Sequence, residues 1–194
     1  MTSVPGAQKA AEAVEVILRY IESIGPDAPL REGLARTPER VIDSWSEIFA
    51  GYNLDAADVL DSTFNAEGYD GIVLLKDIEF HSTCEHHLQP FSGSAHVAYI
   101  PVGRIVGVSK LARLVDMHAR RLQNQERITQ SVADALVEHL QPLGCAIIVE
   151  ASHGCMRCRG VTKQNAVMTT SAMRGVFFEK SEARAELLQL VHRG

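Results

Sequence analysis

The 194-residue chain has no long hydrophobic run, few aromatic residues and no excess of basic charge. No stretch approaches the roughly 18 consecutive apolar residues of a membrane-spanning helix, so we expect no association with a membrane. The formal net charge of −5 is opposite in sign to the basic balance that is typical of nucleic-acid-binding proteins. This charge argues against nucleic acid as a partner, but it leaves room for a local basic pocket that binds a small anion.

Cysteine is also scarce, with four residues in the whole chain. The first residues lack the basic start and apolar run of a secretory signal, so we expect a cytoplasmic location. In that compartment cysteines bind metals, take part in catalysis or are buried, and they rarely form disulfides. The hydrophobic content of 46% is typical of a globular protein, and the length fits one ordinary domain.

The N-terminal third of the chain has the periodicity of helices. Apolar residues recur at helical spacing over residues 7–24, and a Gly-Pro segment then ends the pattern. Thr37 is typical of an N-cap followed by a proline, which predicts a second helix that reaches Phe49. A short helix is expected over residues 55–60. The sequence therefore predicts a helical N-terminal segment over residues 1–65.

The remainder of the chain predicts strands and helices in alternating blocks. The expected strands cover residues 72–80, 92–100, 104–108 and 145–151, with a closing hairpin formed by 166–170 and 175–178. The expected helices cover residues 109–122, 124–140 and 182–191. This order predicts an α+β fold with a mostly antiparallel sheet and helices on one face. We expect it to form a catalytic domain over residues 66–194.

Two short stretches carry most of the reactive side chains. A Cys-Glu-His-His run begins at Cys84, and a His-Gly-Cys run begins at His153. Zinc binds cysteine sulfur and histidine nitrogen, and a catalytic zinc site has three protein ligands with one position left open. Cys84, His87 and Cys155 would form such a site. His86 and His153 would then remain for proton transfer.

A closed structural zinc site is the main alternative, because Cys158 follows Cys155 at the spacing of a CxxC pair. Residues 88–154, 67 in all, separate the two halves of that site, whereas small structural sites keep them within about 12–20 residues. If the strand before Cys155 continues, alternation places Cys155 and Cys158 on opposite faces. A bulge would still allow four ligands, so both sites stay open and the catalytic one is favoured.

A basic turn opens the helix expected at residue 109. Ser109 is typical of an N-cap, and Lys110 and Arg113 share one face of the first turn. Basic side chains are unfavourable at the positive N-terminal end of a helix, so this pattern suggests a bound anion such as phosphate. A solvated surface turn is the alternative. Arg159, which follows the second cysteine stretch, favours the bound anion over the solvated turn.

The next helix opens with Gln125 and Glu126. A glutamate in a first turn is ordinary helix electrostatics. Alternatively, a carboxylate that faces a pocket can accept hydrogen bonds from the N–H edge of a guanine. Zinc, a phosphate-binding turn and a base-reading carboxylate together indicate hydrolysis of a nucleotide.

Several motifs, in the same order, resemble those of GTP cyclohydrolase I from about residue 10 to the C-terminus. The matching stretches are His81-Ser-Thr-Cys-Glu-His-His87, Ala98-Tyr-Ile-Pro101, Gly107-Val-Ser-Lys-Leu111, Gln125-Glu-Arg-Ile-Thr129 and His153-x-Cys-x3-Arg-Gly160, with Gly33-Leu and Thr37-Pro-Glu-Arg40 upstream. The resemblance implies a tunnelling fold, in which subunits join their antiparallel sheets into a ring. It also implies a homodecamer of two five-membered rings, with active sites at subunit interfaces.

The implied reaction converts GTP and water into 7,8-dihydroneopterin triphosphate and formate, the first step of tetrahydrofolate and pterin synthesis. The resemblance implies three groups of site residues. The Zn²⁺ ligands are Cys84, His87 and Cys155. The catalytic residues are His86 and His153 for proton transfer and Ser109 for the ribose rearrangement. The substrate-binding residues are Gln125 and Glu126 for guanine and Lys110, Arg113, Arg159 and Arg40 for the triphosphate, the last from a neighbouring subunit.

Two other functions stay open. The same fold family includes the reductase of 7-cyano-7-deazaguanine, which needs a nucleophilic cysteine without zinc. In this chain the cysteine with basic neighbours is better explained as a metal ligand. A binding or scaffold protein without catalysis is the third possibility.

Overall fold

The computed structural model of the chain describes residues 6–192. The chain forms two compact units, Met1–Ala50 and Gly51–Gly194. The described residues contain no helix that is both long enough and apolar enough to cross a membrane.

The first unit is a pair of helices, α1 (Ala7–Glu22) and α2 (Thr37–Ile48), joined by a segment with the short 3-10 helix η1 (Glu32–Leu34). Both helices were predicted from the sequence. The start of α2 differs by one residue, because Arg36 is the N-cap and Thr37 already lies in the first turn. The Thr37 hydroxyl donates to the Gly33 carbonyl at 3.5 Å and does not cap the helix.

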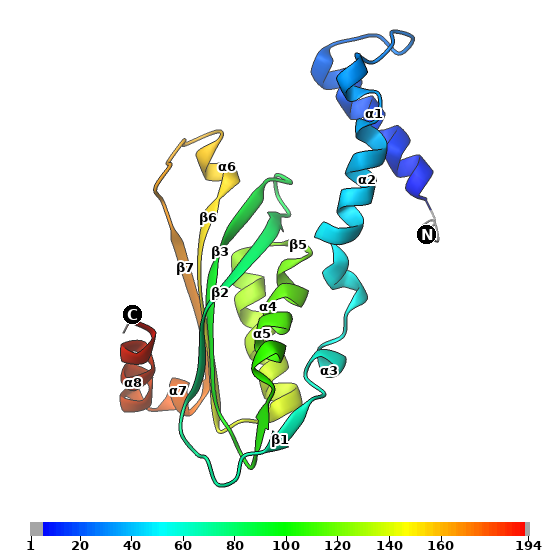
Figure 1. Cartoon of the computed structure of the whole chain (residues 1–194). Helices are drawn as coiled ribbons and strands as arrows, with labels where there is room; N and C mark the ends of the chain where they lie inside the picture. The colour runs from blue at the N-terminus through cyan, green and yellow to red at the C-terminus, as the bar shows by residue number, and fades with distance from the viewer. Residues whose placement is uncertain (1–5, 193–194) are drawn as a thin grey trace. The chain divides into compact units, whose positions relative to one another are not determined.

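The second unit is built on a five-stranded sheet with the order β5-β2-β3-β6-β7 (Figure 1). The strands are β2 (Val73–Cys84), β3 (Pro90–Ile100), β5 (Leu122–Gln123), β6 (Gly144–His153) and β7 (Met168–Gly175). All neighbours are antiparallel except β5 and β2. The predicted mostly antiparallel sheet is confirmed.

A separate two-stranded ladder joins β1 (Thr63–Asn65) to β4 (Arg104–Val106). It follows the short 3-10 helix η2 (Ala50–Asn53) and the helix α3 (Ala56–Val59). The return strand expected at residues 104–108 therefore pairs with β1 and does not join the main sheet. The Val106 backbone N–H donates to the buried Tyr99 hydroxyl at 2.9 Å, which holds this ladder against the far end of β3.

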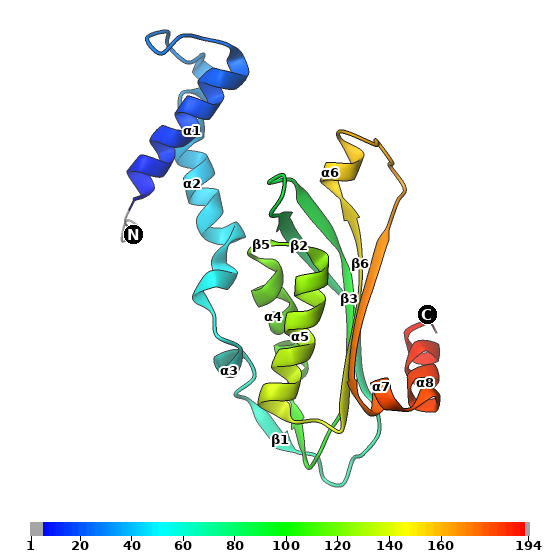
Figure 2. The same cartoon turned by 180° about the vertical axis from the view of Figure 1, so that it is seen from behind.

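One face of the sheet is covered by α4 (Val108–Ala119) and α5 (Gln125–Leu140), as predicted (Figure 1 and Figure 2). Alternate residues of the central strands point into this layer, among them Val97 and Ile147, and meet Leu114 and Ile128 from the helices. All four are fully buried. Burial of one such side chain stabilises a fold by about 1.5–3 kcal/mol, so this layer is the main core.

The opposite face carries the C-terminal helices α7 (Val176–Glu179) and α8 (Ser181–His192), which the sequence did not place there (Figure 2). Phe177 and Leu187 pack with Ala98 and Ala146 in a second buried cluster. The predicted hairpin is wrong, because β7 is one continuous strand and residues 176–179 are helical. Gly175 has φ +57 and ends β7 at the turn into α7.

Candidate metal centre

The first cysteine stretch lies at the turn between β2 and β3. Cys84 is the last residue of β2, and its backbone N–H donates to the Gln89 carbonyl at 2.8 Å. The Leu88 N–H donates back to the Cys84 carbonyl at 2.9 Å, and Leu88 has φ +53. These bonds close a tight turn that presents His86 and His87 beside the Cys84 thiol.

The second stretch lies at the end of β6. The strand stops at His153, and the short helix α6 (Gly154–Arg157) carries Cys155. Gly154 lies so close to β3 that an added Cβ would be 2.6 Å from the Pro90 carbonyl oxygen. The sequence argument that placed Cys155 and Cys158 on opposite faces of a continuing strand is therefore wrong, because no strand continues.

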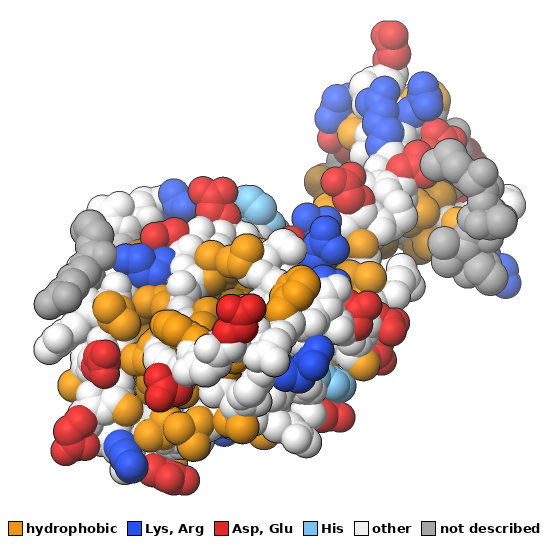
Figure 3. Space-filling model, turned by 60° about the horizontal axis from the view of Figure 1, so that its bottom comes forward, with side chains coloured by type: hydrophobic (Ala, Val, Ile, Leu, Met, Phe, Trp, Pro, Cys, Tyr) orange, Lys and Arg blue, Asp and Glu red, His pale blue; other side chains and the backbone are white. Residues whose placement is uncertain are grey.

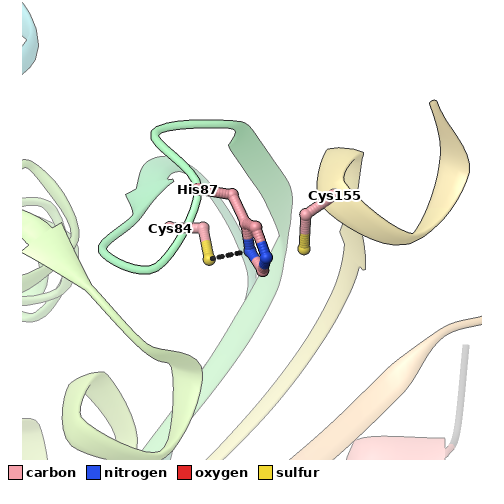
Figure 4. Close-up of side chains that lie close together, drawn as sticks. All are labelled: Cys84, His87 and Cys155. Carbon is pink, nitrogen blue, oxygen red and sulfur yellow. Dashed lines mark hydrogen bonds between the residues drawn. The ribbon is translucent and has the colours of Figure 1, made fainter. Parts of the chain in front are cut away.

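The two stretches bring three potential ligands together (Figure 4). The ligand atoms of Cys84, His87 and Cys155 all lie within 4.8 Å of one another. Cys84 Sγ is 3.8 Å from His87 Nδ1. Burial, and then the charge of the Cys84 sulfur, raises the pKa of the Cys155 thiol. Two sulfurs and one imidazole nitrogen fit zinc with one coordination position left for another group.

Cys158 lies outside this group. Its side chain is exposed, and its thiol donates to Gln89 Oε1 at 3.6 Å. Within residues 6–192, Cys84, His87 and Cys155 are the single group of three or more candidate ligands. The structure therefore brings three candidate ligands together, and Cys158 is not one of them.

The two remaining histidines lie near the metal group, which consists of Cys84, His87 and Cys155, and they differ in burial. His86 is exposed, and its Nδ1 lies 3.9 Å from Cys84 Sγ. His153 is half-buried and stacks on Phe91, with ring centroids 4.6 Å apart and planes at 6°. Burial lowers the pKa of His153, and the nearby Glu126 carboxylate opposes that shift. Glu126 is exposed in the first turn of α5, so a carboxylate does lie near the second cysteine stretch.

Gln125 points into the protein interior, which the sequence did not predict. The side chain is fully buried, and its Oε1 lies 2.9 Å from His153 Nε2. Its amide nitrogen donates to the carbonyls of Val149 and Met168 at 3.0 and 2.9 Å. Direct contact between this side chain and a bound base would require these hydrogen bonds to open.

The basic turn lies at the other end of the sheet. Val106, just before α4, contacts Tyr99, whereas Thr83, next to Cys84, pairs with Pro90. Tyr99 and Pro90 are nine residues apart on β3, or about 30 Å at the usual rise of a strand. A single chain therefore keeps Ser109, Lys110 and Arg113 far from the metal group.

The local structure of this turn also differs from the prediction. Gly107 is the N-cap of α4, and Ser109 lies inside the helix without a capping hydrogen bond. Lys110 Nζ forms an ion pair with Asp61 at 2.8 Å. Ser109 and Arg113 are exposed.

The other two predicted arginines lie elsewhere. Arg159 is exposed after α6, and its charge acts on Cys155 in the direction that lowers the pKa of the thiol. Arg40 is exposed on α2 in the first unit. The described structure of a single chain thus gathers the three candidate metal ligands, His86, His153, Glu126 and Arg159 at one end of the second unit.

Residues 10–192 match the family model described as GTP cyclohydrolase I. The chain belongs to the GTP cyclohydrolase I family. It is 49% identical over 189 residues to GTP cyclohydrolase 1 of Chlorobium phaeovibrioides, covering 95% of this chain and 84% of that protein. It is 53% identical over 173 residues to the Deinococcus radiodurans protein of the same name, with coverages of 89% and 79%. The Rickettsia prowazekii GTP cyclohydrolase 1 is 46% identical over 190 residues, with coverages of 97% and 98%.

The family membership confirms the resemblance that the sequence motifs indicated. Among solved structures, the apo form of archaeosine synthase QueF-Like aligns with 54% of this chain and 93% of its own. Its TM-score is 0.44 and its identity is 18%, which is too weak a likeness to place the fold.

In this GTP cyclohydrolase I family member, an ion-pair clamp joins the turn that carries Cys84 and His87 to α5. Glu85 accepts hydrogen bonds from Arg127 at 2.5 and 3.1 Å and from Asn124 Nδ2 at 2.8 Å. The Arg127 guanidinium, followed by Asn124, lowers the pKa of Glu85. Asn124 also caps α5 through its side-chain oxygen. The sequence analysis missed this clamp, although a carboxylate between two candidate ligands was a signal for a partner nearby.

Proposed function

We propose that this protein is a GTP cyclohydrolase I, which opens the guanine imidazole ring of GTP at C8 and releases formate. The remaining product atoms rearrange and close to 7,8-dihydroneopterin triphosphate, the first step of tetrahydrofolate and pterin synthesis. The observation that carries this proposal is the grouping of Cys84, His87 and Cys155 within 4.8 Å in a chain of this family. A histidine and a carboxylate adjoin the same group.

Zn²⁺ is the cofactor that this donor set fits best. When bound, zinc supplies Lewis-acid chemistry and lowers the pKa of a water molecule to about 7. Histidine is the most frequent general acid or base in enzymes. His86, on the exposed side of the turn, protonates N7 as the imidazole ring opens. His153, held by Phe91 and Gln125, exchanges protons in the hydrolysis of the formamide.

Glu126 binds the guanine edge, while the side chain of the preceding Gln125 stays buried in the protein interior. A carboxylate accepts two hydrogen bonds at once, and the N1–H and the 2-amino group of guanine are paired donors of matching geometry. The position of Glu126 supports this role, because its charge acts on His153. The guanine ring would then lie between the first turn of α5 and the metal group.

The triphosphate site requires a second copy of the chain. Lys110 and Arg113 bind phosphates, and Ser109 assists the ribose rearrangement, but α4, which carries them, begins beside Tyr99, about 30 Å along β3 from Pro90 next to the metal group of the same chain. An extended GTP does not reach across that distance. A neighbouring subunit therefore supplies the basic turn, while Arg159 acts in the same chain as the metal and Arg40 comes from a neighbour.

This division of the site supports a homo-oligomer with interface active sites, and we propose the decamer and tunnelling fold of the family. The end of the second unit that carries β1 and β4 exposes apolar side chains among acidic ones (Figure 3). Phe64, Val102 and Val108 are each about three-fifths exposed there, at 59%, 63% and 63%. Exposed apolar groups at an edge are typical of a protein–protein contact. Residues 66–194 would form the catalytic domain and residues 1–65 the helical segment.

The direct test is anaerobic incubation of the purified protein with GTP, with formate and dihydroneopterin triphosphate as the products measured. We expect both products, their loss when a chelator is added, and their return with zinc. Zinc at one ion per chain without any product would contradict the proposal and favour a binding protein.

Replacing Glu126 by glutamine should lower kcat/KM for GTP by about 100-fold. The change turns one acceptor into an N–H donor opposite the donors of guanine, and a hydrogen bond to a charged group contributes about 1.5–3 kcal/mol. Steady-state kinetics with GTP measures the effect. Glu138→Gln, at an exposed position near the far end of the same helix, is the matched control and should behave as wild type. An unchanged kcat/KM in the Glu126 variant would remove this residue from guanine recognition.

A further inference from the structure

The orientation of the Gln125 amide is fixed by groups that can only accept hydrogen bonds. Backbone carbonyls have no hydrogen to donate, so the atom that faces the carbonyls of Val149 and Met168 must be the amide nitrogen. The same nitrogen lies 3.1 Å from Thr170 Oγ1. The other end of the amide, which faces His153, is therefore the oxygen.

This orientation determines which ring nitrogen of His153 carries hydrogen. Gln125 Oε1 is an acceptor only, and it lies 2.9 Å from His153 Nε2. The contact is a hydrogen bond only if Nε2 is protonated. In the neutral ring, Nδ1 then has the free lone pair and is the single nitrogen that can accept a proton.

The groups that support this contact are buried and hydrogen-bonded to one another. Gln125 and Thr129 have no more than 2% of their surface exposed, and Thr129 Oγ1 donates to the Gln125 backbone carbonyl at 2.9 Å. The hydroxyl oxygens of Thr129 and Thr170 are 2.6 Å apart, within hydrogen-bonding distance. Phe91 stacks on one face of the imidazole. Rotation of the His153 ring out of its plane would break the Gln125 bond and the stacking together.

We propose that Gln125 is a positioning residue that fixes His153 in the Nε2–H tautomer, so that Nδ1 is the atom that exchanges protons during turnover. The inference rests on the proposed function, because it assigns a role within the same site. It differs from a base-binding role for Gln125, which its burial and its hydrogen bonds oppose. A general base of defined tautomer does not need to rotate or exchange a proton with solvent before it acts.

Two substitutions separate this role from simple structural support. Gln125→Met has similar length and volume but no polar group, and we expect kcat to fall about 10- to 100-fold, the size typical of losing a group that orients an active-site imidazole. We expect KM to stay close to that of wild type. Gln125→Glu keeps an oxygen for His153 but loses the nitrogen that donates to the two carbonyls. It should recover a large part of kcat relative to Gln125→Met.

If Gln125 only anchors the sheet, Gln125→Glu should have a kcat as low as that of Gln125→Met or lower, and this result would overturn the proposal. A raised KM with unchanged kcat would instead show that Gln125 binds the base, and would overturn the proposal. Thr170→Val is the matched control, since it removes one partner of Gln125 but leaves both carbonyls and His153 in place. Zinc content and thermal unfolding of each variant show whether the protein is folded.

A spectroscopic measurement on the wild-type protein tests the tautomer without turnover and without a variant at position 125. Nitrogen-15 NMR of the zinc-loaded, histidine-labelled protein, with His153 assigned by its absence in His153→Asn, should show protonated Nε2 and unprotonated Nδ1 in the neutral ring. The opposite tautomer would overturn the proposal. If wild type has the Nε2–H tautomer but releases no formate from GTP, the proposed function fails and the positioning of His153 stands.

Discussion

Cys155→Ala should abolish formate release from GTP while the protein stays folded. The thiol is one of three candidate ligand atoms within 4.8 Å, and α6 carries it at the end of β6, where Cys155 is only partly buried against the main core. Metal catalysis supplies several kcal/mol of transition-state stabilisation, and each 1.36 kcal/mol changes a rate tenfold. We therefore expect a loss of at least about 10³-fold in kcat, together with zinc content well below one per chain. Formate release, metal analysis and thermal unfolding measure the three properties.

The matched control is Cys158→Ala, which makes the same chemical change three residues away. Cys158 is exposed and its thiol contacts Gln89 Oε1 at 3.6 Å, outside the ligand group. This variant should keep its zinc and its activity. Loss of zinc in Cys158→Ala would instead restore the closed four-ligand site. Full zinc and full activity in Cys155→Ala would remove Cys155 from the metal centre.

The grouping of the three candidate metal ligands was predictable because their chemistry is local. A thiol and an imidazole three residues apart at the end of an apolar strand indicate a metal half-site without any knowledge of the fold. The structure adds the reason why the two halves meet. β2 and β6 are both antiparallel to β3, so they run in the same direction, and their C-terminal ends lie at the same end of the sheet. Cys84 and His153 are the last residues of these two strands.

The surroundings of the ligands were not predictable from local sequence. Gln125 occupies the first turn of a helix, where a polar side chain is normally exposed, but β7 covers it through Met168 and Thr170, more than 40 residues later in the chain. The Glu85–Arg127 clamp also spans 42 residues. Such contacts depend on the order of the strands in the sheet, and the hydrophobic periodicity of the sequence does not reveal that order.

The errors in secondary structure have similar physical causes. Residues 176–178 are β-branched and aromatic, which favours a strand, but Phe177 is fully buried against the small residues Ala98 and Ala146 on the second face. The predicted fold had helices on one face of the sheet and assigned none to this second face. Thr37 and Ser109 were expected as N-caps, whereas the helices begin at Thr37 and Val108. Helix boundaries shift by one or two residues without a change in the fold.

Gly93→Ala should strongly destabilise the second unit. Gly93 lies in β3 opposite Ala151 of β6, and an added Cβ would be 1.8 Å from the Glu150 carbonyl oxygen and 2.7 Å from Ala151 Cα. Both are backbone atoms, so no side-chain rotation relieves the overlap. We expect the free energy of unfolding to fall by about 3 kcal/mol or more, at the upper end of the range for overpacked cores. In a chain of this size that corresponds to a thermal midpoint about 6–12 °C lower.

The same substitution should weaken zinc binding, although no ligand changes. Gly93 pairs with Phe80 of β2 and Ala151 of β6, the two strands that end at Cys84 and His153. Separation of β3 from β6 moves the two halves of the metal centre apart. Gly107→Ala is the control, because its added methyl group would have ordinary contacts at 3.6 and 3.8 Å. A Gly93→Ala variant with the wild-type thermal midpoint and full zinc content would contradict this prediction. It would show that the sheet accommodates the methyl group and that the close approach of β3 and β6 does not determine the geometry of the site.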